Sequence, residues 1–130
     1  MRIVIFASLS VLALGACRAD ETVAAYGAAE RTWVLGSIDG VPYEDRATFN
    51  FGENGEVFGQ APCNRWFARQ TAPYPWFAIE AVGATKMACS ALDAEQSFFS
   101  ALQDMTLSEV SGDFLVLSND AERQMVFTAE

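Results

Sequence analysis

The chain has 130 residues, of which 8 are basic and 17 acidic, giving a net charge of −9, and it contains no histidine. This length provides for one domain with a single hydrophobic core. An acidic chain without a basic stripe repels nucleic acid and anionic lipid headgroups, so neither is an expected partner of its surface. The absence of histidine excludes serine and cysteine hydrolases with an imidazole base, and it excludes zinc sites with histidine ligands.

Residues 1–16 have the features of a cleavable secretory signal. Arg2 precedes an apolar run that is interrupted by two serines, and this run is shorter than the about 20 residues that a membrane-spanning helix needs. The run ends in Leu-Gly-Ala-Cys, which resembles a lipobox, so we expect Cys17 to be acylated after cleavage. An ordinary signal peptide with an incidental cysteine is the alternative. Cleavage would remove Arg2 and leave 7 basic and 17 acidic residues, a net charge of −10.

Residues 17–31 are expected to form the lipidated cysteine and a short tether, and residues 32–130 the folded domain. The tether is rich in alanine and would reach roughly 45 Å if fully extended at about 3.3 Å per residue. Cys17 is followed by Arg18 and not by aspartate, which by resemblance to Gram-negative lipoproteins indicates the outer membrane. The sequence therefore predicts a protein of the bacterial cell envelope that contacts the membrane through its N-terminal lipid.

From residue 32 onward, runs with two-residue periodicity alternate with turn motifs, which predicts a mostly β domain. Asp-Gly at 39–40 and Asn-Gly at 54–55 are strong turn signals. The last three runs are joined by short turns and indicate an antiparallel meander. Strands are expected over residues 32–38, 47–51, 56–59, 65–70, 76–80, 106–111, 114–118 and 123–128.

One amphipathic helix is expected before the meander. Ser90, with Asp93 three residues later, resembles a capping box. An apolar stripe follows, which includes Leu92, Phe98 and Leu102. Many short strands together with one such helix predict a strongly curved antiparallel sheet, or a small barrel, with the helix packed against it.

Cys63 and Cys89 remain as a pair after the acylated position is set aside. In an exported protein such a pair is most simply a disulfide. Free, redox-active thiols are the alternative, although the wide spacing differs from the Cys-x-x-Cys arrangement of redox sites. For a loop of this length, the chain-entropy model gives a stabilisation of about 3.5 kcal/mol.

The segments around these two cysteines resemble the characteristic motifs of the META domain family, which includes HslJ-like heat-shock lipoproteins. The motifs are Cys-Asn-Arg at 63–65 and Thr-Lys-Met-Ala-Cys at 85–89, and the resemblance extends from about residue 32 to residue 127. Pro62 and Ala68 depart from it, since members often have glycine at these positions. The resemblance implies a lipocalin-like curved sheet with one helix, and a role in envelope stress tolerance without established catalytic residues.

A set of polar and aromatic residues near the cysteines forms the candidate binding surface. Tryptophan and tyrosine supply much of the contact energy at interfaces. The same aromatic side chains, with Phe67 and Phe77, are also suited to fill a small core. The alternative for the two polar residues at 64 and 65 is a turn hydrogen bond and an ion pair, respectively. The candidate residues are Asn64, Arg65, Trp66, Tyr74, Trp76 and Lys86.

These observations predict a non-enzymatic envelope module that binds a polypeptide or a small apolar ligand, with no cofactor, no metal and no catalytic residues. The alternative is an inhibitor of a periplasmic or secreted hydrolase, which would use a rigid loop at 72–75. An enzyme based on Lys86, the sole lysine, or on a carboxylate pair ranks last, because no catalytic motif surrounds these groups.

Overall fold

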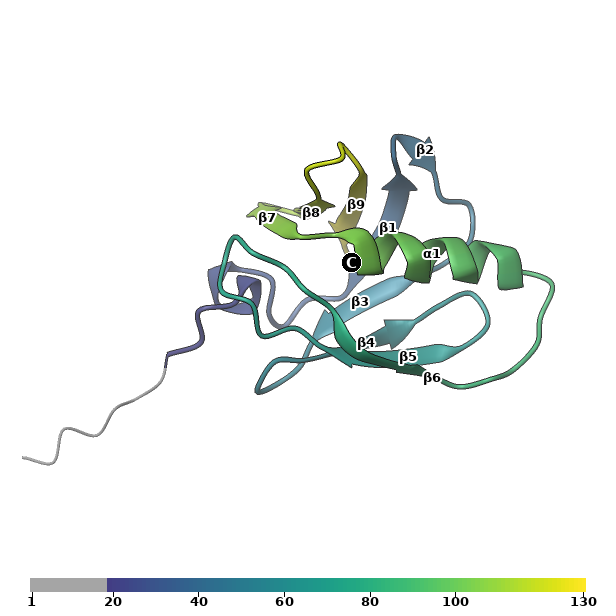
Figure 1. The fold of residues 1–130 in the computed structure, drawn as a ribbon, viewed down its shortest axis with the longest axis horizontal. Coiled ribbons are helices and arrows are strands. Elements are labelled where there is room, and N and C mark those ends of the chain that lie inside the picture. Colours follow the sequence, from purple (N-terminus) through teal and green to yellow (C-terminus); the bar gives the residue numbers. More distant parts are fainter. Residues whose placement is uncertain (1–18) are drawn as a thin grey trace, which may run out of the picture.

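The structure is a computed structural model that describes residues 19–130, so the predicted signal and Cys17 lie outside the described residues. In the described part, a nine-stranded antiparallel sheet curls around α1 (Leu92–Asp104) (Figure 1). The strand order is β6-β5-β4-β3-β1-β9-β8-β7, and β2 pairs with β1 beside this path. The two end strands do not pair with each other, so the sheet is an open half-barrel. The prediction of a strongly curved sheet with one packed helix is confirmed.

Most strands lie where alternation and turn motifs predict them. Asp39 and Gly40 have φ angles of 52° and 78°, as a two-residue type I′ hairpin requires. The predicted C-terminal meander is confirmed by continuous antiparallel registers between its three strands. The strands are β1 (Trp33–Ile38), β2 (Val41–Pro42), β3 (Thr48–Phe51), β4 (Glu56–Gln60), β5 (Arg65–Arg69), β6 (Glu80–Ala84), β7 (Leu107–Ser111), β8 (Phe114–Ser118) and β9 (Gln124–Ala129).

The strand expected at 76–80 is wrong, because β6 begins only at residue 80. Other groups satisfy the backbone of the preceding segment. The Phe77 N–H donates to the Thr106 carbonyl at 2.9 Å, and the Ala78 N–H donates to Oε1 of the Gln70 side chain at 3.0 Å. The alternating pattern at 76–80 therefore reflects a loop that packs against the core and joins the sheet only through the bridge between Trp76 and Leu107.

Helix α1 presents its apolar stripe to the concave face of the sheet, where Phe98 and Leu102 are fully buried. Its N-cap is Ala91, so the capping box predicted at Ser90 is wrong. Acidic residues in the first turn offset the positive end of the helix dipole instead. No helix within residues 19–130 is both long and apolar enough to cross a membrane.

Large aromatic side chains fill the space between α1 and the sheet. Phe49 lies at the centre and makes an edge contact with Trp66 at a centroid distance of 5.2 Å and with Phe127 at 6.1 Å. Trp66 in turn contacts Phe98 of the helix at 5.8 Å. Such edge-to-face pairs add about 0.5–1.5 kcal/mol each beyond the burial of apolar area. The concave side of the half-barrel is therefore a packed core.

The segment before β1, expected to be a tether, contributes to this core. It contains a short 3₁₀ helix, η1 (Val23–Tyr26), and both Val23 and Ala28 are fully buried. The Trp33 indole N–H donates to the Ala28 carbonyl at 2.9 Å. The packed part of the chain thus begins at Val23 or earlier, ahead of the boundary expected at residue 32.

Candidate functional site

A buried carboxylate and a disulfide join the two cysteine segments to α1. Cys63 and Cys89 form a disulfide with a Cα–Cα distance of 5.7 Å, as predicted. Glu95 of α1 is buried beside it. Its Oε1 accepts the backbone N–H groups of Cys63 at 3.0 Å and Asn64 at 2.8 Å, and its Oε2 accepts the Asn64 side-chain amide at 2.8 Å. Glu95 therefore holds the start of β5 against the helix.

Asn64 connects this carboxylate to the loop 85–89. Its Oδ1 accepts the Met87 N–H at 2.6 Å and the Thr85 hydroxyl at 3.0 Å, while its Nδ2 also donates to the Met87 carbonyl at 3.1 Å. Because these bonds use both ends of a buried amide, Asn64 organises the loop from inside. Its placement on a binding surface is corrected accordingly.

The other candidate residues do not form one continuous surface. Trp66 is only 1% exposed and its indole N–H donates to the Thr48 carbonyl at 3.1 Å, so it belongs to the core and not to a binding surface. Arg65 and Lys86 are exposed near β6. Tyr74 and Trp76 lie in the segment beside β7, at the opposite end of the strand order.

A groove opens between β6, α1 and the loop 85–89, and we name it the β6–α1 groove. It has a volume of about 680 Å³. Met87 and Phe67 contribute to its lining and remain 68% and 56% exposed, respectively. The hint available in the sequence was the apolar Met87 directly after Thr85 and Lys86. The lining includes the apolar Phe67, Val82, Met87, Leu92 and Phe99 and the polar Lys86 and Gln103.

Three basic residues of the described chain have no carboxylate partner. Residues 19–130 contain six basic residues, and three of them form ion pairs, which are Arg31 with Asp113, Arg46 with Glu130, and Arg123 with Asp39 and Asp104. In the described part of the chain, Arg65, Arg69 and Lys86 form no ion pair within 4.0 Å. All three belong to β5 or to the loop that follows β6. Arg65 begins β5 beside the loop 85–89 that carries Lys86, whereas the Arg69 guanidinium donates to the Asn54 carbonyl at 2.7 Å in the turn before β4.

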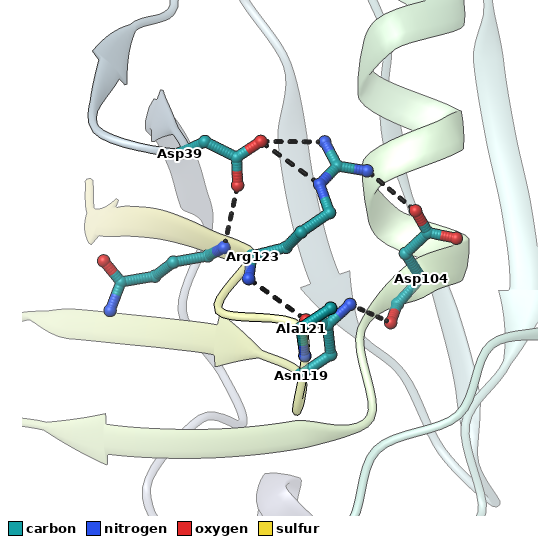
Figure 2. Close-up of polar contacts among 6 residues, drawn as sticks. Asp39, Asp104, Asn119, Ala121 and Arg123 are labelled. Carbon is teal, nitrogen blue, oxygen red and sulfur yellow. Dashed lines mark hydrogen bonds and ion pairs between the residues drawn. The ribbon is translucent and has the colours of Figure 1, made fainter.

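A second cluster of charged groups surrounds Arg123 at the C-terminal end of α1 (Figure 2). Its guanidinium donates to Oδ2 of Asp39 at 3.0 Å and 3.1 Å and to Oδ2 of Asp104 at 2.7 Å. The backbone N–H of Gln124 donates to Oδ1 of Asp39 at 3.0 Å. This hydrogen bond and the neighbouring Arg123 lower the pKa of Asp39 below its ordinary value. The cluster ties the β1–β2 turn and the β8–β9 turn to the end of α1.

A second, more polar groove of about 870 Å³ lies between β2 and the opposite face of α1. The Tyr43 hydroxyl at its wall donates to the Ala94 carbonyl at 2.7 Å. Burial, with the nearby Asp45 and Glu95 carboxylates, raises the pKa of Tyr43 to about 12, so this hydroxyl stays a donor at neutral pH. Within residues 19–130, no three acidic, cysteine or histidine side chains are grouped to hold a metal ion.

The family is settled by the sequence match. The model of the META domain matches residues 27–130. This chain belongs to the META domain family. The resemblance predicted from the two cysteine motifs is confirmed, and the match begins inside the packed N-terminal segment. No curated protein is significantly similar to the chain in sequence.

Solved structures with the same fold confirm the architecture of this META domain. An NMR structure of a protein from Burkholderia xenovorans has a TM-score of 0.66 and 18% identity, and the match covers 83% of this chain and 87% of that one. A crystal structure of a DUF4847 family protein from Bacteroides vulgatus has a TM-score of 0.63 and 15% identity, with coverage of 82% and 96%. At these identities the likeness concerns the fold.

Proposed function

We propose that this META domain is a non-enzymatic binding module of the bacterial cell envelope, anchored by lipid on Cys17, and that it binds a polypeptide in the β6–α1 groove. The groove carries the proposal because it exposes large apolar side chains, Met87, Val82 and Leu92, beside the uncompensated charge of Lys86. Exposed apolar surface that contains methionine and lies next to a charge is typical of protein-binding sites.

The wall of this groove is held in place before any ligand arrives. The disulfide and the Asn64–Glu95 hydrogen bonds fix the loop 85–89 at several points. A preorganised surface loses little conformational entropy on binding, which raises the affinity gained from each contact. A role in envelope stress tolerance, by binding an unfolded or exposed partner segment, is consistent with such a site.

The arrangement of the polar groups supports binding over catalysis. The Thr85 hydroxyl, the nearest candidate nucleophile to Lys86 in sequence, donates to Asn64 Oδ1 at 3.0 Å and accepts the Arg65 N–H at 3.2 Å. The Glu95 carboxylate accepts three N–H groups. These hydrogen bonds direct the Thr85 hydroxyl proton at Asn64 and the Glu95 oxygens at N–H groups of the protein, so neither group is arranged to act as a nucleophile or a base on a substrate.

Inhibition of a periplasmic or secreted hydrolase is a second candidate, favoured by the loop 72–75. Backbone hydrogen bonds tie this loop to two other segments, from Tyr74 N–H to Glu21 O at 2.7 Å and from Ser108 N–H to Pro75 O at 2.8 Å. Trp76 follows directly and is 58% exposed. A rigid loop beside an exposed tryptophan is suited to inserting into an enzyme cleft.

In-cell photo-crosslinking separates the two candidates. A photoreactive amino acid is placed at Met87 in the groove, at Trp76 beside the loop, and at the exposed Glu53 as a control. A protein captured from Met87 alone supports the groove, and capture from Trp76 alone supports the inhibitor. Products that are the same from all three positions, or absent from all of them, would contradict binding of a polypeptide at either site.

The lipid anchor is tested separately with Cys17→Ser. Metabolic labelling with a palmitate analogue and fractionation of the envelope should show loss of the label and release from the outer membrane. Ala19→Ser serves as the control and should keep both. An unlabelled wild-type protein, or a Cys17→Ser variant that stays in the membrane, would contradict anchoring through this cysteine.

A further inference from the structure

The two edges of the sheet are treated differently in this fold. The segment 73–77 covers β7, because the Ser108 N–H donates to the Pro75 carbonyl at 2.8 Å and Trp76 forms a bridge with Leu107. At the other end of the sheet, β6 pairs with β5 alone among residues 19–130, and it lies at the margin of the fold (Figure 1). An uncovered edge strand offers a row of backbone groups to another chain.

The register identifies which backbone groups of β6 face outward. The Thr85 N–H donates to the Arg65 carbonyl of β5 at 3.0 Å, and Gly83 lies opposite Phe67. Backbone groups of an antiparallel strand point alternately to its two sides. The ladder has a register shift between Phe67 and Arg69, beside Ala81 with its positive φ of 54°. On the C-terminal side of this shift the alternation holds, so the N–H and C=O groups of Val82 and Ala84 are directed away from β5, toward the open edge.

Both faces beside this edge offer contacts for the side chains of an added strand. On one face the edge borders the β6–α1 groove, with Val82, Leu92 and Phe99 among its lining. On the other face the Phe67 ring covers Gly83, so closely that a Cβ at this position would overlap the ring. Successive residues of a strand point to opposite faces, so a bound strand would place every second side chain in the groove.

The charges around the edge select the chemistry of the partner. Arg65 and Lys86 lie beside the edge without ion pairs, in a chain whose net charge is −9. Carboxylates on an incoming segment would find these cations uncompensated, whereas a basic segment would be repelled by them.

We propose that the open edge of β6 binds an extended, acidic polypeptide segment as an additional strand, with alternate apolar side chains in the β6–α1 groove. This inference rests on the proposed function and adds to it the binding mode and the class of partner. Main-chain hydrogen bonds to Val82 and Ala84 supply affinity, and the groove together with Arg65 and Lys86 supplies specificity.

The test uses the full chain purified from cells in detergent and three synthetic decapeptides. The first peptide alternates valine and glutamate, the second alternates valine and lysine, and the third repeats the first with N-methyl groups on alternate residues. Hydrogen exchange of individual amides is followed by NMR. At ten times its Kd, the first peptide should slow exchange at Val82 and Ala84 roughly tenfold. The lysine peptide and the N-methylated peptide should leave both amides unchanged.

Two variants examine the charge and the edge. Arg65→Glu changes a charge on the face of the sheet opposite the groove, where the glutamates of the bound strand point. It should weaken binding of the glutamate peptide at least about tenfold, an effect of the order expected for reversing one charge at an interface. Arg46→Glu, which changes a residue paired with Glu130 elsewhere, should leave the affinity unchanged. Val82→Pro removes an outward N–H and should abolish binding. If that variant fails to fold, the N-methylated peptide examines the same hydrogen bonds.

Three outcomes would overturn the inference. Equal binding of the first and third peptides, with shifts at Met87 and Leu92 but no slowed exchange at the edge, would leave groove binding intact and exclude strand addition. If no peptide binds, an acidic strand is excluded as the partner of the β6 edge. Crosslinking from Met87 then tests separately whether the groove binds a polypeptide. Exchange at β6 that slows with protein concentration, without peptide, would identify a second copy of the chain as the occupant.

Discussion

The hydrogen-bonding role of Glu95 illustrates how a buried charge can be structural. It is the only acidic residue of the described chain with a fully enclosed position, and three N–H donors surround it. A buried carboxylate is costly unless its oxygens are satisfied, and hydrogen bonds to a charged acceptor are the stronger kind. Glu95 thereby links a helix, a strand and a disulfide through one side chain.

Glu95→Gln should destabilise the domain by about 1–3 kcal/mol. The amide replaces one carboxylate oxygen with an NH₂ group, which cannot accept the N–H bond that this oxygen accepts in the wild type. Urea unfolding at neutral pH measures the change. Glu109→Gln, at an exposed position on β7, is the matched control and should stay within about 0.5 kcal/mol of the wild type. Equal stability of the two variants would mean that the carboxylate does not hold the loop.

Asp39→Asn should remove a contribution to stability that depends on pH. The backbone N–H of Gln124 and the Arg123 guanidinium lower the pKa of Asp39 below 3.8. A carboxyl group whose pKa is lowered by folding stabilises the folded state above its unfolded pKa, and this stabilisation is lost as pH falls through the folded pKa.

The wild type should therefore exceed Asp39→Asn in unfolding free energy by a constant amount above about pH 5, and the difference should shrink below about pH 4. Urea titrations over this range measure it. Glu53→Gln removes a carboxylate that makes no hydrogen bond in the described structure and serves as the control. A difference between wild type and Asp39→Asn that grows in acid would contradict the assigned ion pair.

At the scale of elements, periodicity and turn residues predicted most of the sheet, and the exceptions have physical reasons. The pattern at 76–80 alternates because Phe77 packs into the core from a loop. Strand β6 shows no apolar alternation because a Phe67 ring from the neighbouring strand covers its glycine. The alanine-rich stretch before β1 resembled a tether. Its small side chains instead let the backbone at Ala28 come close enough to Trp33 to accept the hydrogen bond from the indole N–H. The β6–α1 groove could not be predicted from the sequence, because residues of β6 form one of its walls and no strand was expected there.

Gly59→Ala should destabilise β4 and its contacts strongly. A Cβ at this position would overlap the Thr48 carbonyl and lie 2.8 Å from Nε1 of Trp66. These two atoms form a buried hydrogen bond, so the backbone must shift to keep it. We expect a loss of about 3 kcal/mol, the sum of overpacking and a weakened buried bond.

Thermal unfolding, monitored by tryptophan fluorescence, measures this effect. Gly36→Ala in β1 is the matched control, since its Cβ would meet the Val126 carbonyl oxygen at a tolerable 3.4 Å. Its effect should stay below about 1 kcal/mol. Similar losses for the two variants would indicate that generic strand propensity, and not the contact with Thr48 and Trp66, determines the result.

At the scale of the whole molecule, the N-terminal segment is part of the folded body. Val23→Asp should lower the unfolding free energy by about 3 kcal/mol or more, because it buries a charge without a partner. Ala25→Asp, two residues away at an exposed position of η1, provides the control and should be nearly neutral. Urea unfolding distinguishes them, and two neutral variants would show that the segment does not pack on the core.

The covered edge at β7 has a consequence for the stoichiometry of assembly. A sheet that is open at both ends can accept a new chain at each end, and the addition can repeat until a fibre forms. Here the segment 73–77 occupies the start of β7, at Leu107 and Ser108, and obstructs addition at that end, so the edge of β6 is the one left for an added strand. Pairing through β6 then stops after a single addition, which limits every complex formed by this route to two partners. Many such molecules held close together would therefore pair through this edge without polymerising.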